Sequence, residues 1–328
     1  MADRVLVTGG AGYIGAHACK ALARAGFLPV AFDNLSTGWG EAVKWGPLAR
    51  GDLMDRASID AALAMHQPVA VMHFAALSLV GQSMQDPGQY WRVNTGGALN
   101  LLEACAAAGV RNFVLSSTCA TYGDQDGVLL TEDTPQRPIN AYGGSKLAIE
   151  LMLRDFGISK GISHVIFRYF NVAGADPEGE IGERHLPETH LIPLLLEAVA
   201  GKRPALTVFG TDYPTRDGTC VRDYVHVTDL AAAHVLGLRR LLDGQGNGTY
   251  CLGTGRGFSV REVIEASRAV TNRAVPVVYG ERRPGDAAAL VSSSTLAMSE
   301  LGWEPERSNL RQMIGDAWAW EQGPGFTR

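Results

Sequence analysis

The stretch VLVTGGAGYIGAHA, residues 5–18, joins a short β-branched run to the start of a helical pattern through closely spaced glycines. Gly10, Gly12 and Gly15 stand in G-x-G-x-x-G register directly after the expected strand, with Gly9 before them. Glycines at these positions permit a tight turn and a close approach of the backbone to a pyrophosphate, and the helix N-terminus offers unpaired N–H groups. The stretch therefore predicts a dinucleotide-binding turn at the start of the chain.

Outward from this turn, apolar runs alternate with longer helical patterns up to about Val172. We expect strands at 4–8, 28–33, 70–75, 112–117 and 163–171, and helices from about Ile14, at 58–65, at 91–108 and from Tyr142. Near-continuous apolar strands separated by helices are typical of a buried parallel sheet. The pattern predicts a doubly wound, Rossmann-type α/β domain over residues 1–172.

Past Asn171 this alternation stops, and a stretch rich in Gly, Pro and charged residues follows. Helices are expected over residues 191–200, after Thr228 as a plausible N-cap, and over 259–270. We expect residues 173–328 to form a smaller, irregular α/β domain for the substrate, with about 224–245 packing back onto the first domain.

Composition limits the classes of function. The chain has 328 residues, 46% hydrophobic residues and a formal net charge of -5, so it has no electrostatic footprint for nucleic acid. Its five cysteines are odd in number and form no C-x-x-C, which suggests neither a disulfide framework nor a zinc site. Neither a signal-peptide pattern nor a membrane-spanning apolar stretch is visible. We expect a cytoplasmic protein with no metal and no membrane partner.

Three further segments add to the nucleotide signal. Asp33 ends the second expected strand, where a carboxylate accepts hydrogen bonds from the hydroxyls of an adenosine ribose. Because Asn34 rather than an arginine follows, repulsion of a 2'-phosphate favours NAD over NADP. Asp52 follows another short strand, where it can bond the adenine amino group, and HFAALS (73–78) ends at the sheet edge that binds ligands.

Hydroxyl, phenol and ammonium groups follow in order. LSSTCATYG places Thr118 after the fifth expected strand, at the same edge. Tyr142 and Lys146 in AYGGSKLAIE are four residues apart on one helical face, where the ammonium favours the phenolate. The isolated pair is more often a surface contact, but together with Thr118 it indicates a catalytic set.

With TGGAGYIG, SSTCATYG, YGGSK and RYFNVAG in this order, the chain resembles the extended short-chain dehydrogenase/reductases. Within them, DYPTRDGTCVRDYVHVTDLA and RRPGD are similar to the UDP-glucose (UDP-galactose) 4-epimerase family. The resemblance extends over nearly the whole chain, to about Trp320.

The resemblance implies a role for each matching residue. Tyr142 would take the proton of the sugar 4-hydroxyl, Lys146 would hold the nicotinamide ribose and lower the Tyr142 pKa, and Thr118 would hydrogen-bond the 4-oxygen. Besides these and the glycine turn, the NAD positions matched are Tyr13, Ile14, Asp33, Asn34, Asp52, Leu53, Phe74, Ala75, Ala76, Asn94 and Phe170. The positions matched around the UDP-sugar are Asn171, His190, Leu191, Thr207, Phe209, Arg222, Arg283 and Asp286.

Two positions depart from the family pattern. Ser78 stands where several members carry a lysine that reaches the cofactor phosphates, which puts one charge contact in doubt. His190 replaces an asparagine near the substrate phosphates and can still donate a hydrogen bond.

The implied reaction is oxidation at C4 of a UDP-hexose by tightly bound NAD, rotation of the 4-keto intermediate, and reduction on its opposite face. A UDP-pentose 4-epimerase needs the same residues and stays open as an alternative. A 4,6-dehydratase would need Asp-Glu where Cys119 and Ala120 stand, and a non-catalytic NAD-sensing protein would not need Thr118, Tyr142 and Lys146.

The resemblance also implies a homodimer, paired through the helices near 91–108 and 142–156. Leu290 falls where the family places the residue that limits room beside the sugar C2 substituent, although AAALVSS is also a plausible core segment. We expect Leu290 to disfavour N-acetyl sugars.

Overall fold

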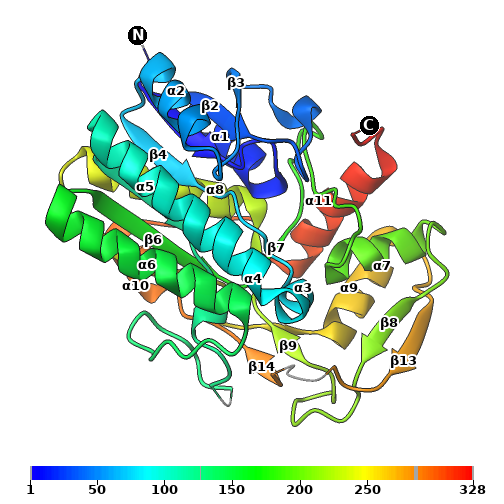
Figure 1. Ribbon diagram of the computed structural model, residues 1–328. Coiled ribbons are helices and arrows are strands. Elements are labelled where there is room, and N and C mark those ends of the chain that lie inside the picture. The colour runs from blue at the N-terminus through cyan, green and yellow to red at the C-terminus, as the bar shows by residue number, and fades with distance from the viewer. Residues whose placement is uncertain (1, 126, 284–286, 327–328) are drawn as a thin grey trace.

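The computed structural model describes residues 2–125, 127–283 and 287–326 (Figure 1). In these residues one parallel sheet has the strand order β11-β6-β5-β4-β1-β2-β3. Its strands are β1 (Arg4–Thr8), β2 (Leu28–Asp33), β3 (Leu48–Arg50), β4 (Ala70–His73), β5 (Asn112–Ser116), β6 (Ser163–Tyr169) and β11 (Gly248–Leu252). The chain runs outward from β1 to β3, then returns to β4 beside β1 and continues the other way. The predicted doubly wound sheet is confirmed, and its topological switch point lies between β1 and β4.

Helices cover both faces of this sheet. One layer contains α2 (Arg56–His66), α5 (Gly97–Ala108) and α6 (Ala141–Lys160), and the other contains α1 (Tyr13–Arg24) and α8 (Val227–Leu242). Leu6, Val71 and Ile166 face the first layer, whereas Val7 and Met72 face the second, so adjacent strand residues alternate between two apolar cores. The central strands are apolar on both sides because both sides are buried.

The helix expected at 91–108 begins earlier and is not uniform. Asp86 is the N-cap residue of the short helix that begins at Pro87, and its carboxylate accepts a hydrogen bond from Gln89 N (3.0 Å). Helix α4 (Pro87–Tyr90) then continues through a π-helical turn, η2 (Trp91–Gly96), into α5. A short helix α3 (Val80–Gln85) and the 3-10 turns η1 (Gly40–Ala42) and η3 (Cys119–Thr121) complete this half. The Asp-Pro cap fixes the start, which the apolar pattern alone did not indicate.

The strand expected over 163–171 divides in two. After β6, residues 171–173 form β7 (Asn171–Ala173), which pairs with β10 (Tyr224–His226) in a separate sheet. The smaller unit also contains α7 (Leu191–Val199), β8 (Leu206–Phe209), β9 (Val221–Arg222), β12 (Phe258–Ser259), α9 (Val260–Thr271), β13 (Val277–Gly280), β14 (Ala289–Leu290), α10 (Thr295–Leu301) and α11 (Leu310–Gln322). Helices α7, α9 and α11 share its apolar core.

Residues past 223 return to the large sheet. Helix α8 packs against α1 and the sheet, and β11 then adds a strand beside β6. The expected Thr228 N-cap is wrong by two residues: His226 is the cap, and its Nδ1 accepts from Thr228 N at 3.1 Å. A histidine is an uncommon cap, so the preference for Ser, Thr, Asp and Asn pointed to its neighbour.

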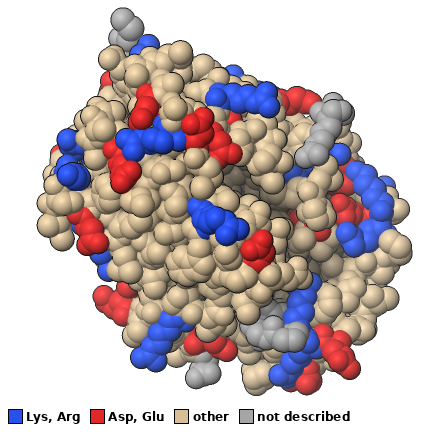
Figure 2. All heavy atoms as spheres, in the orientation of Figure 1, with Lys and Arg blue, Asp and Glu red and all other residues tan. Residues whose placement is uncertain are grey.

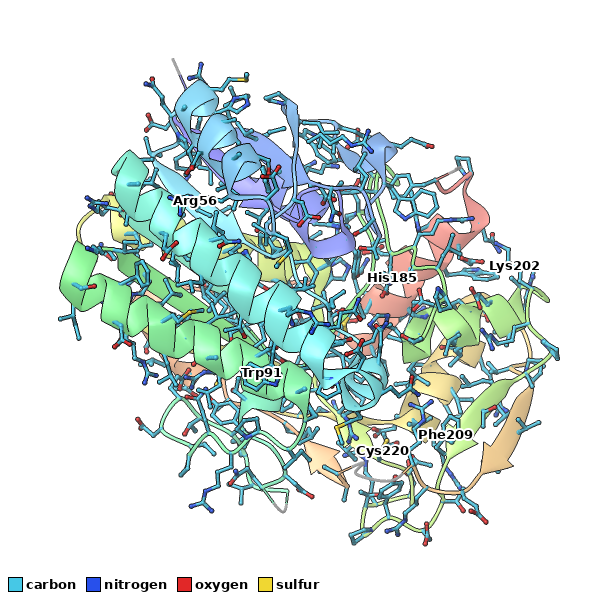
Figure 3. The ribbon with its side chains drawn as sticks, in the orientation of Figure 1. Arg56, Trp91, His185, Lys202, Phe209 and Cys220 are labelled. Atoms are coloured by element: carbon cyan, nitrogen blue, oxygen red, sulfur yellow. The ribbon has the colours of Figure 1, made fainter. Side chains whose placement is uncertain are left out.

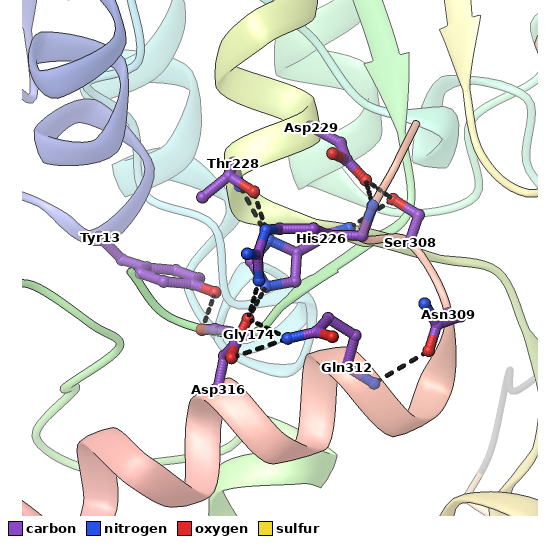
Figure 4. A network of polar contacts seen from close by, with 10 residues as sticks. Tyr13, Gly174, His226, Thr228, Asp229, Ser308, Asn309, Gln312 and Asp316 are labelled. Carbon is purple, nitrogen blue, oxygen red and sulfur yellow. Dashed lines mark hydrogen bonds and ion pairs between the residues drawn. The ribbon is translucent and has the colours of Figure 1, made fainter. Parts of the chain in front are cut away.

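The same histidine contributes to the junction between the two parts (Figure 4). Its Nε2 lies 3.1 Å from the Asp316 carboxylate of α11. Beside it, the Tyr13 hydroxyl from the glycine turn donates to the Gly174 carbonyl at 2.6 Å. The turn that opens α1 is therefore tied to the first residues of the smaller unit.

Candidate active site

The glycine turn is fixed by backbone contacts that leave no room for a side chain. A Cβ on Gly10 would lie 2.7 Å from the Ala31 Cβ, and one on Gly15 would lie 2.1 Å from the Gly9 carbonyl. Gly9 itself has φ +72°, a conformation that L side chains rarely adopt. Gly12 caps α1, so the helix begins at Tyr13 with its N-terminus open. This is the geometry that a pyrophosphate requires.

Asp33 ends β2 next to this turn. Its carboxylate accepts from Ala11 N (3.0 Å) and Leu35 N (2.8 Å). Burial raises its pKa, and these two hydrogen bonds oppose that change. Beyond it, the Asn34 amide donates to the Asp52 carboxylate at 2.9 Å. The structure therefore brings together three of the residues that the sequence assigned to the adenosine end.

The segment after β4 lies at the switch point between β1 and β4 and is held there by hydrogen bonds. Phe74 and Ala75 both donate their backbone N–H to the Thr8 carbonyl. The buried Asn94 side chain accepts from Leu77 N (2.8 Å) and donates to Leu77 O (3.0 Å) and Ser145 Oγ (3.1 Å). Asn94 thus connects this segment to the helix that carries Tyr142 and Lys146.

The other predicted cofactor residues differ in surroundings. Ile14 packs against the core on the α8 side, and the Leu53 side chain is buried in the core beneath α2 and α5. Phe170 packs against the small cluster of Cys119 and Tyr122, Ala76 is half-buried, and Ser78 is exposed.

The three proposed catalytic side chains meet where β5 ends and α6 begins. Thr118 follows β5 and accepts from Ala120 N at 3.1 Å. Gly143 lets the first turn of α6 approach the same segment, because a Cβ there would lie 2.4 Å from the Ala120 carbonyl. This approach places Tyr142 within hydrogen-bond reach of Thr118.

The pKa of Tyr142 differs from the lowered value that we expected. Burial raises the pKa of Tyr142 to about 12, and the hydrogen bond with Thr118 only partly opposes it. Burial also lowers the pKa of Lys146 to about 8, against the attraction of Glu150. The Lys146 ammonium donates to the Ser116 carbonyl at 2.9 Å. The protein alone therefore does not provide the lowered Tyr142 pKa that we expected from Lys146.

A buried network behind these residues was missed by the sequence argument. The Arg168 guanidinium binds both oxygens of Glu150, at 2.6 and 3.1 Å, and Ser117 Oγ donates to the same carboxylate at 2.5 Å. Arg168 also donates to the Tyr122 hydroxyl at 2.8 Å. Glu150 stands four residues after Lys146, a spacing that could have suggested a shared helical face.

On the substrate side, strands of the smaller unit bring several predicted residues together. The Asn171 amide donates to the Asp223 carbonyl at 3.0 Å. Arg222 and Leu290 are opposite each other in the β9–β14 pair, and the Arg222 guanidinium donates to the Val221 and Ala287 carbonyls. Leu290 is half-buried at this pair rather than in a main core.

Two further sets of predicted substrate residues lie at β8 and at the start of α7. The Arg283 guanidinium lies 3.9 Å above the Phe209 ring of β8, with the exposed Thr207 on the same strand. His190 caps α7 and Leu191 is its first residue. Burial lowers the His190 pKa, but hydrogen bonds to Glu183 and Glu188 outweigh this and raise it to about 10. Asp286 lies outside the described residues.

Comparison with known proteins places this geometry in a family. Residues 5–253 match the model of the NAD dependent epimerase/dehydratase family. The UDP-glucose 4-epimerase of Rhizobium meliloti (strain 1021) is 51% identical over 318 residues, which cover 97% of each chain.

Two solved structures are similar in both sequence and shape. The UDP-glucose 4-epimerase of Brucella ovis in complex with NAD is 48% identical, with a TM-score of 0.94 over 97% of this chain and 98% of that one. The Stenotrophomonas maltophila UDP-glucose-4-epimerase with bound NAD and formylated UDP-arabinopyranose is 40% identical, with a TM-score of 0.94 over 98% of each chain. The sheet order, the glycine turn and these matches agree, and the chain belongs to the NAD-dependent epimerase/dehydratase family.

Proposed function

We propose that this protein interconverts UDP-glucose and UDP-galactose by epimerisation at C4, with NAD held in the site. The close approach of the first turn of α6, which carries Tyr142 and the buried Lys146, to the Thr118 segment at the carboxyl edge of the sheet carries the proposal. Relatives at about half identity are UDP-glucose 4-epimerases, which favours a hexose over a pentose.

The residues present fit NAD. The turn excludes a Cβ at Gly10 and Gly15 and leads into the N-terminus of α1, where a pyrophosphate can bind. The Asp33 carboxylate is already oriented by two backbone N–H groups at the position for a ribose. We propose that residues 1–172 hold NAD, with 224–245 packed against them, and that 173–328 mainly hold the UDP-sugar.

The roles follow from the chemistry of each group. When bound, NAD supplies the oxidising equivalent for C4 and a positively charged ring, and that charge opposes the burial that raises the Tyr142 pKa. Tyr142 would then take the 4-hydroxyl proton, Thr118 would hydrogen-bond the 4-oxygen, and Lys146 would hold the ribose. Arg222 and Arg283 offer guanidiniums to the diphosphate. Cys119, buried beside Thr118, offers no carboxyl group for a 4,6-elimination.

The experiment is a substrate panel with purified protein: UDP-glucose, UDP-galactose, UDP-xylose and UDP-arabinose. We expect rapid conversion between the first pair. Turnover confined to the pentoses would replace the hexose assignment, and no turnover of any UDP-sugar would favour a binding role.

We propose a homodimer formed through α5, α6 and the π-helical turn before α5. Trp91 and Leu151 on this face are 45% and 48% exposed, and they line an apolar groove with Met84 and Ile139. Figure 3 shows Trp91 between these helices, and the same face has few charged side chains in Figure 2. A monomer mass by light scattering at micromolar concentration would contradict this.

No helix in the described residues is long and apolar enough to cross a membrane. Positive and negative side chains alternate on the face shown in Figure 2, without a continuous basic patch. None of the five cysteines, all within the described ranges, forms a disulfide. These features support a proposed cytoplasmic location.

A further inference from the structure

The segment between β7 and α7 folds two glutamates and two histidines into one group. Glu183, His185, Glu188 and His190 each offer one nitrogen or carboxylate oxygen, and these atoms all lie within 4.8 Å of one another. We call these four residues the Glu/His cluster. Figure 3 shows His185 near the middle of the molecule, between the sheet and α7.

The nitrogen–oxygen distances in the Glu/His cluster fall close to those between two ligands of one zinc ion. Glu183 Oε1 lies 3.3 Å from His185 Nδ1 and 3.1 Å from His190 Nδ1, while the two oxygens of Glu188 face different rings, Oε2 at 3.5 Å from His185 Nδ1 and Oε1 at 2.9 Å from His190 Nδ1. Zinc bonds to histidine nitrogen and carboxylate oxygen are about 2.0–2.2 Å, so a tetrahedral site has ligand–ligand edges of about 3.3–3.6 Å. The four nitrogen–oxygen distances therefore lie within a few tenths of an ångström of these edges, and all four ligand atoms lie within 4.8 Å of one another.

The charges of the Glu/His cluster also suit a divalent cation. The Glu183 and Glu188 side chains are only 8% and 6% exposed, and they repel each other. Two buried carboxylates need two compensating positive charges. One divalent ion with two neutral imidazoles meets this need in place of the two protons that His185 and His190, whose pKa values the carboxylates raise, otherwise hold.

His185 adds an independent observation. Its Nδ1 is shielded from solvent and has no well-aligned hydrogen-bond partner among the described residues, although both carboxylates are near. A buried ring nitrogen without a hydrogen bond is costly. A metal ion between the four atoms would satisfy it.

The backbone around the Glu/His cluster is held in place by neighbours. Glu188 accepts from the backbone N–H of Thr189 (2.7 Å) and His190 (2.8 Å), which orients its carboxylate. The Trp320 indole donates to Glu183 O (3.0 Å) and the Trp39 indole donates to Arg184 O (2.9 Å). Such outer contacts are typical of a preorganised metal site.

We propose that the Glu/His cluster binds one zinc ion, or a divalent transition-metal ion of similar preference, through His185, His190, Glu183 and Glu188. Two imidazoles and two carboxylates favour such an ion over calcium or magnesium, which prefer more oxygen ligands. The ion would fix the segment between β7 and α7. This inference depends on the fold and not on the proposed reaction.

The test uses the full-length protein after removal of metal with a chelator and dialysis. Cobalt(II) is titrated in the absence of UDP-sugar, and visible absorption reports tetrahedral coordination. Zinc is then added and its content per chain is measured by plasma mass spectrometry. We expect one ion per chain, an intense tetrahedral cobalt spectrum, and displacement of cobalt by zinc.

Variants locate the site. H185A and E183Q should each lose the cobalt spectrum and at least about tenfold in metal affinity, because loss of even an outer-shell partner typically costs that much. H66A, on the half-exposed α2 C-terminus, is the matched control and should bind like the wild type. Circular dichroism and NAD content establish that each variant is folded.

The cobalt titration of the wild type tests the proposed metal site even if a variant does not fold. Absence of stoichiometric binding by the wild type, an octahedral cobalt spectrum, or unchanged binding by folded H185A and E183Q would each overturn the proposal. Because none of these readouts requires turnover, failure here leaves the proposed epimerase function untouched.

Discussion

The cofactor end of the site is formed mainly by backbone, whereas the substrate end depends mainly on side chains. At the cofactor end, Gly10 and Gly15 act by having no side chain, and the site is formed by the backbone of neighbouring residues. At the substrate end, the segment between β7 and α7 depends on side chains with distant partners, such as Lys20 with Asp176 at 2.7 Å. A site made of local backbone leaves a readable motif, whereas one made of long-range side-chain contacts does not.

Histidines show the same contrast. In the sheet half, burial lowers the pKa of His17 and His234 to about 4. In the segment before α7, hydrogen bonds to Glu183 and Glu188 outweigh burial and raise the pKa of His190. Apolar surroundings keep His17 and His234 neutral, whereas His190 is surrounded by carboxylates.

The largest effect should come from Tyr142, where the two ends meet. Tyr142→Phe removes only the ionisable oxygen, so NAD content and UDP-sugar binding should be retained while kcat falls by about 10²–10⁴-fold. Steady-state kinetics with UDP-galactose, together with measured NAD content, checks this. Turnover close to that of the wild type would remove Tyr142 from the mechanism.

The next prediction concerns the sheet half alone. His234 is buried between Phe74 and Phe167, and burial lowers its pKa from 6.5 to about 4. Between these values only the unfolded chain takes up the proton, so stability falls as the pH falls, by about 3 kcal/mol at full effect.

His234→Leu should remove this contribution. The loss of stability between pH 7 and pH 4 should therefore be smaller by about 3 kcal/mol than in the wild type. Urea unfolding at a series of pH values measures it, with His66→Leu as the control. If the free energy of unfolding depends on pH in the same way in the wild type and in His234→Leu, this residue does not contribute to the loss of stability at low pH.

Asp33 tests the cofactor end separately. Asp33→Ala removes the charged acceptor proposed for the ribose hydroxyls, and hydrogen bonds to charged groups contribute about 1.5–3 kcal/mol. NAD retention should fall by about tenfold to a hundredfold, while the KM for UDP-glucose at saturating NAD stays the same. NAD per chain after gel filtration is the measurement, with the exposed Asp60→Ala as control. Unchanged cofactor content would exclude Asp33 from the site.

The smallest effect is expected at the substrate end, at Leu290. A branched side chain beside the sugar C2 should crowd an acetamido group, at a cost of about 1–3 kcal/mol. Leu290→Ser should raise kcat/KM for UDP-GlcNAc by about tenfold, with little change for UDP-glucose. If the wild type already converts both sugars equally well, Leu290 does not limit the pocket.

Much of the cofactor end could be predicted because its signals are local. The glycine register, Asp33 at the end of β2 and the apolar strands each depend on a few neighbouring residues. The segment read as one strand over 163–171 was not predictable in the same way. Asn171 leaves the sheet because β10, more than fifty residues later, pairs with it.

The sequence by itself determined the doubly wound sheet, the position of the glycine turn and the order of Thr118, Tyr142 and Lys146, since all three follow from local spacing. Only the tertiary structure decided the Glu150–Arg168 pair and the Glu/His cluster. The cysteine pattern gave no sign of a metal site, and Glu183, His185, Glu188 and His190 form a group only where the chain folds back between β7 and α7. Their chemistry depends on burial and mutual distance, which arise when segments remote in sequence exclude water from them.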